Sequence, residues 1–261
     1  MLFYNPYVIC HARLINIFVY NNLMEIQIAV AKVNKYAVSE SGDTIETIER
    51  PNGGLSVVMA DGQTSGRGAK AVSTMVVRKV VSLLAEGVRD GAAARAASDY
   101  LYTERSGKVS ACLSILSVDF QSDTLVLTRN NPSPVYFLRA GRVECLESDS
   151  KPIGTSRNIR PTITELPLES GLLFVMITDG IFYAGDRYGT PLDLRTLLEG
   201  LLEEELPGTC EIADLILKQA IQLDQNRPND DMTIVVLRAV AGEYGPIRRM
   251  TVNLPVPFHD D

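Results

Sequence analysis

Histidine and cysteine, which build many catalytic and metal sites, are scarce and widely separated in this chain. The two histidines, His11 and His259, lie near the ends of the 261-residue sequence, which argues against a histidine general base or a Ser-His-Asp triad. No two of the four cysteines form a Cys-x-x-Cys pair, so we do not expect a zinc site. Single cysteines such as Cys112 are typical of small core residues in a reducing compartment, and we therefore expect a cytoplasmic protein.

The chain also lacks a basic surplus and a long apolar run. Its formal net charge of −7 makes nucleic-acid binding unexpected. No uninterrupted stretch of about 20 apolar residues is present, so we predict no membrane helix. Residues 1–23 carry no basic segment or cleavage site of a signal peptide. We interpret them as an extension that precedes a natural start at Met24, and a short docking element is the alternative.

Alternating and continuous apolar runs predict a series of strands and two pairs of helices. The predicted strands cover residues 26–33, 45–48, 55–60, 110–119, 124–129, 134–139, 142–146, 159–166, 172–178 and 232–239. Helical spacing of apolar residues predicts helices over 67–84, 91–103, 192–202 and 210–225. The short connections predict antiparallel neighbours within a continuing sheet. We predict an α+β fold, a four-layer α-β-β-α sandwich of two mainly antiparallel sheets flanked by helices. One domain is expected over 24–240, with an extended tail over 241–261.

Acidic residues stand at the ends of three predicted strands. Asp61-Gly62 follows the run 57–60, Asp179-Gly180 follows 174–178, and Asp230-Asp231 leads into 234–237. One Asp-Gly pair after a strand is usually an ordinary turn. Three such sites indicate a shared function. The turn signal at 51–54 predicts a hairpin that places Asp43 near Asp61.

Clustered carboxylates repel one another unless a cation neutralises them. Hard divalent cations such as Mg²⁺ and Mn²⁺ prefer oxygen ligands. Asp61, Asp179 and Asp230 would supply carboxylates, and Gly62 would supply a carbonyl. Two ions about 3.5–4 Å apart can activate a water for in-line displacement at phosphorus without a protein nucleophile. The chain contains no nucleophile–histidine set, which agrees with this chemistry.

These motifs resemble the metal-dependent serine/threonine protein phosphatases, the PPM or type 2C family, and especially their bacterial sporulation and stress-response branch. The resemblance spans about residues 26–238. It rests on Ser41-Gly42-Asp43, on the Asp-Gly loop over 61–66, on Thr178-Asp179-Gly180 and on the Asp-Asp-x-Thr motif over 230–233. Further similar segments are 131–134, 152–154 and 166–171.

The resemblance implies a role for each aspartate. Asp61 would bridge two Mn²⁺ or Mg²⁺ ions, with the Gly62 carbonyl on the first. Asp179 and Asp230 would hold the second ion, and Asp43 would contact the shell of the first. Asp231 is a candidate for supporting the ligands or for holding a third ion. For every one of these aspartates the alternative is a cap or turn carboxylate.

Some features depart from the family pattern or leave alternatives open. Thr64 replaces the second glycine of the Asp-Gly-x-Gly loop, where a positive φ would strain a β-branched residue. The phosphate-binding arginine of eukaryotic relatives has no match, and Lys32, Lys35 and Arg67 are not assigned to its place. The resemblance implies that the helix over 67–84 and its alanine-rich partner move to complete the metal site, whereas the residues alone equally predict that both only cover the sheet.

The first functional hypothesis is a phosphatase that hydrolyses phosphoserine and phosphothreonine on a cytoplasmic signalling protein. By analogy, its substrate would be a STAS-domain or stress-complex protein. The second hypothesis is a catalytically weak or inactive binding module with the same fold, for which Thr64 is the sequence support. A third is a metallohydrolase of small phosphoesters. Neither a nucleic acid nor a membrane is an expected partner.

Overall fold

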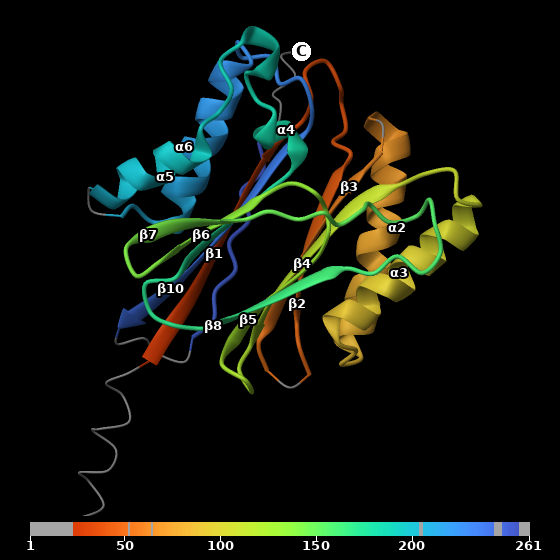
Figure 1. Ribbon diagram of the computed structural model, residues 1–261, viewed down its shortest axis with the longest axis horizontal. Coiled ribbons are helices and arrows are strands. Elements are labelled where there is room, and N and C mark those ends of the chain that lie inside the picture. Colours follow the sequence, from red (N-terminus) through yellow and green to blue (C-terminus); the bar gives the residue numbers. More distant parts are fainter. Residues whose placement is uncertain (1–22, 52, 64, 204–205, 243–246, 256–261) are drawn as a thin grey trace, which may run out of the picture.

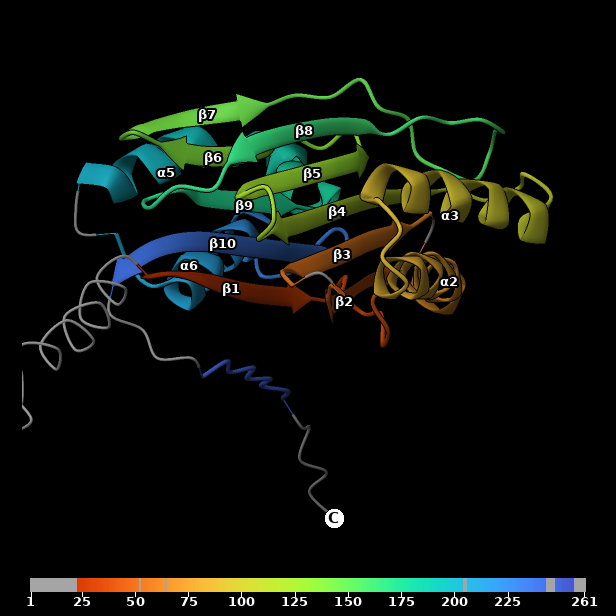
Figure 2. The ribbon, with the colours of Figure 1, turned by 90° about the horizontal axis from the view of Figure 1, so that it is seen from below.

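The computed structural model describes residues 23–51, 53–63, 65–203, 206–242 and 247–255. The predictions for residues 1–22 and for Thr64 lie outside these residues. Within them, two five-stranded antiparallel sheets pack face to face, with helices on both outer sides (Figures 1 and 2). The predicted four-layer α-β-β-α sandwich is confirmed.

The first sheet has the order β1-β10-β9-β6-β7. Its strands are β1 (Leu23–Val33), β10 (Met232–Gly242), β9 (Leu173–Ile177), β6 (Val135–Arg139) and β7 (Arg142–Leu146). The second sheet has the order β2-β3-β4-β5-β8. Its strands are β2 (Asp43–Glu49), β3 (Leu55–Gly62), β4 (Ala111–Asp119), β5 (Thr124–Asn130) and β8 (Thr162–Pro167). β10 therefore continues beyond the predicted end of its strand at residue 239.

Both faces of the central strands are buried, which explains their continuous apolar runs. In β10, Ile234 and Val236 pack toward the helices, whereas Val235 and Leu237 pack between the sheets. The same alternation divides β3 between the two kinds of core. A sheet buried on both sides needs apolar residues at consecutive positions rather than at every second one.

Each outer helical layer is a pair of helices, as predicted. α2 (Gly66–Ala85) and α3 (Asp90–Arg105) cover the second sheet, and buried Ala93, Ala94 and Ala97 let α3 pack closely there. α5 (Leu194–Glu203) and α6 (Thr209–Leu223) cover the first sheet. The structure adds a short α4 (Asp179–Phe182) and a 3₁₀ helix (Asp186–Tyr188) that the sequence did not predict. In the described part of the chain no helix has the length and apolarity needed to cross a bilayer.

The prediction that the strands over residues 110–178 continue one sheet is wrong at three places. β5 and β6 are joined by residues 131–134 but lie in different sheets. The chain changes sheet again between β7 and β8 and between β8 and β9. Pro132 and Pro134 lack the N–H groups that a hairpin ladder needs. The crossing at 131–134 is fixed locally, because the Ser133 N–H donates to Asn131 Oδ1 at 2.9 Å and Arg129 Nη1 donates to the Ser133 carbonyl at 2.9 Å.

Candidate metal centre

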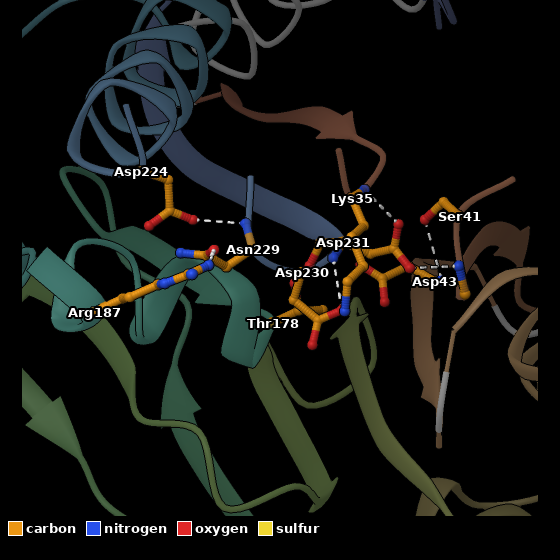
Figure 3. A network of polar contacts seen from close by, with 10 residues as sticks. Lys35, Ser41, Asp43, Thr178, Arg187, Asp224, Asn229, Asp230 and Asp231 are labelled. Carbon is orange, nitrogen blue, oxygen red and sulfur yellow. Dashed lines mark hydrogen bonds and ion pairs between the residues drawn. The ribbon is translucent and has the colours of Figure 1, made fainter. Parts of the chain in front are cut away.

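Strand pairing brings the predicted aspartates to one end of the two sheets. Asp43 and Asp61 are direct register partners in the β2–β3 hairpin, which confirms their predicted proximity. Asp179 follows β9 and begins α4, and Asp230 precedes β10. The Thr178 N–H donates to the Thr233 carbonyl at 3.0 Å, so the ends of β9 and β10 lie together. Figure 3 shows Asp230 beside Thr178, with Asp231 between Asp230 and Asp43.

The glycine of each Asp-Gly pair permits a close backbone contact beside its aspartate. A Cβ at Gly62 would lie 2.2 Å from the carbonyl oxygen of Ala69 in α2. A Cβ at Gly180 would lie 2.1 Å from the carbonyl oxygen of Asp231. Because real Cβ atoms do not approach backbone oxygens so closely, only glycine lets α2 and the residues before β10 pack against these turns.

One oxygen of the Asp43 carboxylate has a partner and the other has none among the described residues. The Thr233 hydroxyl donates to Asp43 Oδ2, whereas the buried Oδ1 accepts no hydrogen bond. The Asp43 backbone carbonyl accepts hydrogen bonds from Lys70 Nζ at 2.8 Å and Lys32 Nζ at 3.2 Å. An unpartnered buried carboxylate oxygen is costly unless something binds it, and a cation suits this acceptor.

Burial and mutual repulsion raise the pKa of three of the aspartates. The pKa of Asp61 rises to about 9, first because of burial and then because of the charges of Asp43, Asp179 and Asp230. The pKa of Asp43 rises to about 7, mainly because of burial, against the lowering effect of the Thr233 hydroxyl. Burial, followed by the charge of Asp230, also raises the pKa of Asp179. These groups therefore lie within electrostatic reach of one another and need positive charge to ionise together.

Asp230 and Asp231 have different surroundings although they are adjacent in sequence. The Asp230 side chain is 48% exposed and lies 3.8 Å from Lys35 Nζ. Asp231 is buried, and its two oxygens accept the N–H groups of Lys35 at 2.9 Å and Gly42 at 2.7 Å (Figure 3). Asp231 therefore anchors the loop between β1 and β2, which agrees with the supporting role considered from the sequence.

The donor set fits hard divalent cations. It consists of carboxylates from the ends of four strands, β2, β3, β9 and β10. One of them, Asp43, has an unpartnered buried oxygen, and positive charge would relieve their mutual repulsion. In the described residues, no three acidic, histidine or cysteine side chains stand together as a ready set of metal ligands. Mg²⁺ sites commonly use one or two carboxylates and several waters, so such a set is not required. The ligand roles of Asp43, Asp61, Gly62, Asp179, Asp230 and Asp231 stay predictions.

Cys112 is the other register partner of Asp61 and is partly buried. Burial, and after it the charge of Asp61, raises the pKa of its thiol to about 12. A thiol with this pKa stays protonated at neutral pH and is a poor nucleophile.

The sequence did not identify several residues that shape the site. Thr233 orients Asp43, and Lys70 binds the backbone beside it. Buried Asp224 accepts the N–H groups of Gly185 at 2.9 Å and Asn229 at 2.8 Å, and so ties the segment after α4 to the residues before Asp230 (Figure 3). Apart from Asp224 and Asn229, these partners are far apart in sequence, so no local pattern could have revealed them. Of these residues, only Thr233 belongs to a motif found in the sequence, the Asp-Asp-x-Thr motif over 230–233.

Comparison with known proteins identifies the family. Residues 51–240 match the family model of the Stage II sporulation protein E (SpoIIE), and the chain belongs to this family. It is 24% identical over 200 residues to the Stage II sporulation protein E of Bacillus subtilis (strain 168), covering 76% of this chain and 24% of that protein. The chain thus spans about a quarter of the length of this relative.

Solved structures share the fold. The PP2C phosphatase domain of SpoIIE from Bacillus subtilis, solved with a fragment of its regulatory domain, superposes with a TM-score of 0.69 at 22% identity. That match covers 82% of this chain and 63% of the other. The catalytic domain of the serine/threonine protein phosphatase PstP, in complex with two manganese ions, gives a TM-score of 0.64 at 18% identity and covers 84% of this chain and all of the other. The fold is therefore that of the PP2C phosphatases.

Proposed function

We propose that the chain is a metal-dependent phosphatase that hydrolyses phosphoserine and phosphothreonine in proteins. The observation that carries this proposal is the convergence of Asp43, Asp61, Asp179 and Asp230 at one end of a PP2C fold, with the pKa of three of them raised. The manganese ions bound to PstP support a divalent metal, either Mn²⁺ or Mg²⁺.

The predicted ligands would divide two ions between them. Asp61 would contact both, the Gly62 carbonyl and the surroundings of Asp43 would serve the first, and Asp179 and Asp230 would serve the second. When bound, the ions would supply Lewis-acid chemistry, which lowers the pKa of water and neutralises charge on the phosphoryl group. A third ion near Asp231 would have to share a carboxylate whose two oxygens already accept backbone N–H groups.

The protein's own residues would orient this site. The Thr233 hydroxyl holds one oxygen of Asp43 and leaves the other available. Lys35 Nζ lies 3.8 Å from Asp230 Oδ1, and its side chain is 36% exposed. A partly exposed ammonium at this position can attract a dianionic phosphate to the mouth of the site.

Asp179→Asn tests the proposal, with Asp186→Asn as a matched control. Asp186 is an exposed aspartate in the 3₁₀ helix after α4. Removal of the Asp179 charge should lower turnover of a phosphoserine peptide at least about 100-fold, because positioning and charge stabilisation supply most of phosphoryl-transfer catalysis. It should also weaken Mn²⁺ binding in isothermal titration, whereas Asp186→Asn should change neither. Undiminished turnover by Asp179→Asn would contradict the proposal.

A binding module without catalysis is the second candidate. The observation that favours it is that the described residues show no ready set of three metal ligands. Titration of the metal-free protein with Mn²⁺ separates the two functions, since a module should show no tight site. Turnover of a nucleotide in preference to a phosphoprotein would instead indicate a hydrolase of small phosphoesters.

The substrate and the location rest on the family resemblance alone. We propose a phosphorylated signalling protein of the cytoplasm, such as a STAS-domain or stress-complex protein. Incubating candidate phosphoproteins with the enzyme and Mn²⁺, followed by phosphate release, tests this assignment. Equal rates on an unrelated phosphoprotein would argue against it.

A further inference from the structure

A basic groove runs along one face of α2 beside the candidate metal centre. It is a hollow of about 410 Å³ lined by Arg67, Lys70 and Arg78, with Glu40 from the loop before β2. Residues three and eleven positions apart lie on the same helix face at 3.6 residues per turn. The three cations therefore form a line about 16 Å long.

Lys70 is held by the fold through hydrogen bonds to Asp43 and Thr44, but the fold does not account for Arg67 and Arg78. Among the ion pairs between described residues, none includes Arg67, Lys70 or Arg78. Arg67 lies in the first turn of α2, where the helix dipole disfavours positive charge, and that turn contains no acidic residue. Arg67 and Arg78 are exposed. A line of cations of this kind is notable in a chain with a formal net charge of −7.

Lys70 connects the groove with the aspartates. Its Nζ donates to the Asp43 carbonyl at 2.8 Å and lies 2.9 Å from Thr44 Oγ1. A chain that follows the groove from Arg78 toward Lys70 therefore arrives beside Asp43. An extended peptide rises about 3.3 Å per residue, so about five residues would cover the three cations.

We propose that this groove binds acidic residues that flank the phosphorylated side chain of a protein substrate. The proposal rests on the proposed phosphatase function and specifies its substrate class. Carboxylates of the substrate would pair with Arg67 and Arg78, and its phosphorylated residue would enter the site past Lys70. The groove is short and the protein as a whole is acidic, which favours a short acidic peptide segment over an extended nucleic acid.

Double charge reversal, Arg67→Glu with Arg78→Glu, tests the groove, and Arg95→Glu is the matched control. Arg95 is exposed on the neighbouring helix α3 and does not line the groove. Two phosphoserine peptides serve as substrates, one with a run of aspartates on one side and one with serines in their place. The unmodified enzyme should prefer the acidic peptide in kcat/KM by about 3- to 10-fold at low salt, as expected for two exposed ion pairs.

The double variant should lose or reverse this preference, while Arg95→Glu should retain it. Turnover of p-nitrophenyl phosphate, which has no flanking residues, should be unchanged in all three proteins. An equal preference for the acidic peptide in the enzyme and the double variant would overturn the proposal. So would an equal loss of preference in Arg95→Glu, because the effect would then come from overall charge.

A binding measurement separates failure of the groove from failure of the phosphatase function. The metal-free protein is titrated into a fluorescent acidic peptide that carries no phosphate. Fluorescence anisotropy then reports the affinity of the peptide under conditions in which no hydrolysis occurs. Binding that the double variant loses and Arg95→Glu retains would support the groove even if no protein hydrolysed any phosphoester. Binding that is equal in the three proteins, or absent at low salt, would overturn it whatever the activity.

Discussion

Replacement of Asp231 by alanine should strongly destabilise the protein. Asp231 as a residue is 4% exposed, and its carboxylate accepts the N–H groups of Lys35 and Gly42. Alanine would leave both donors without this acceptor and release the loop between β1 and β2. A hydrogen bond to a charged group contributes about 1.5–3 kcal/mol, so the loss of two should lower the free energy of unfolding by about 3–6 kcal/mol.

Thermal unfolding followed by circular dichroism in the presence of a chelator measures this effect. For a domain of this size, 1 kcal/mol corresponds to about 2–4 °C, so Tm should fall by roughly 6–24 °C. Asp214→Ala is the control, because Asp214 is an exposed aspartate of α6 and its loss should change stability by less than about 0.5 kcal/mol.

The same experiment with Mn²⁺ distinguishes an anchor from a metal ligand. If Asp231 only anchors the loop, Tm of the variant should fall by a similar amount with and without Mn²⁺. A decrease seen only with Mn²⁺ would refute the anchoring role and indicate a ligand. A decrease equal to that of Asp214→Ala in both conditions would refute the account of the two backbone hydrogen bonds.

Three further predictions concern stability. The raised pKa of Asp61, about 9 against an ordinary 3.8, means that the folded protein retains a proton that the unfolded chain loses. The stability of the metal-free protein should therefore fall as pH rises between these values. Asp61→Asn should show a smaller difference in Tm between about pH 5 and pH 8 than the unmodified protein does. An equal difference in the two proteins would contradict this. Gly180→Ala would place Cβ 2.1 Å from the Asp231 carbonyl oxygen and should cost about 1–3 kcal/mol in urea unfolding, and an unchanged midpoint would contradict the contact. Arg50 Nη1 lies 2.7 Å from Oδ1 of buried Asp90. Arg50→Met should therefore lower the free energy of unfolding by about 3–5 kcal/mol in the same assay, because it leaves the Asp90 charge buried without a partner. The double variant Arg50→Met with Asp90→Asn should lower it by less than Arg50→Met alone.

Much of the fold and the position of the site could be predicted from local patterns. The turn at 51–54 and the apolar runs on either side predicted a hairpin that brings Asp43 near Asp61, and the structure fixes the register that makes them direct partners. Helical spacing predicted α2, α3, α5 and α6 within a few residues. These features depend on interactions between residues close in sequence, which a single sequence records directly.

The allocation of strands to sheets could not be predicted in the same way. The connection over 131–134 is as short as a hairpin, but its prolines and the bond from Arg129 to Ser133 lead the chain into the other sheet. The anchoring roles of Asp224 and Asp231 depend on backbone N–H groups up to 196 residues away. Such partners meet only through tertiary packing, so their side chains look like ordinary loop aspartates in the sequence.

The release of phosphate from a phosphoserine peptide by metal-free protein, before and after addition of Mn²⁺, tests the central claim most directly. We expect no turnover in the chelated protein, turnover after Mn²⁺ is restored, and loss of that turnover in Asp179→Asn but not in Asp186→Asn. Turnover that continues without metal, or that is absent at every Mn²⁺ concentration in a folded protein, would contradict the claim that these converging aspartates form a phosphatase site.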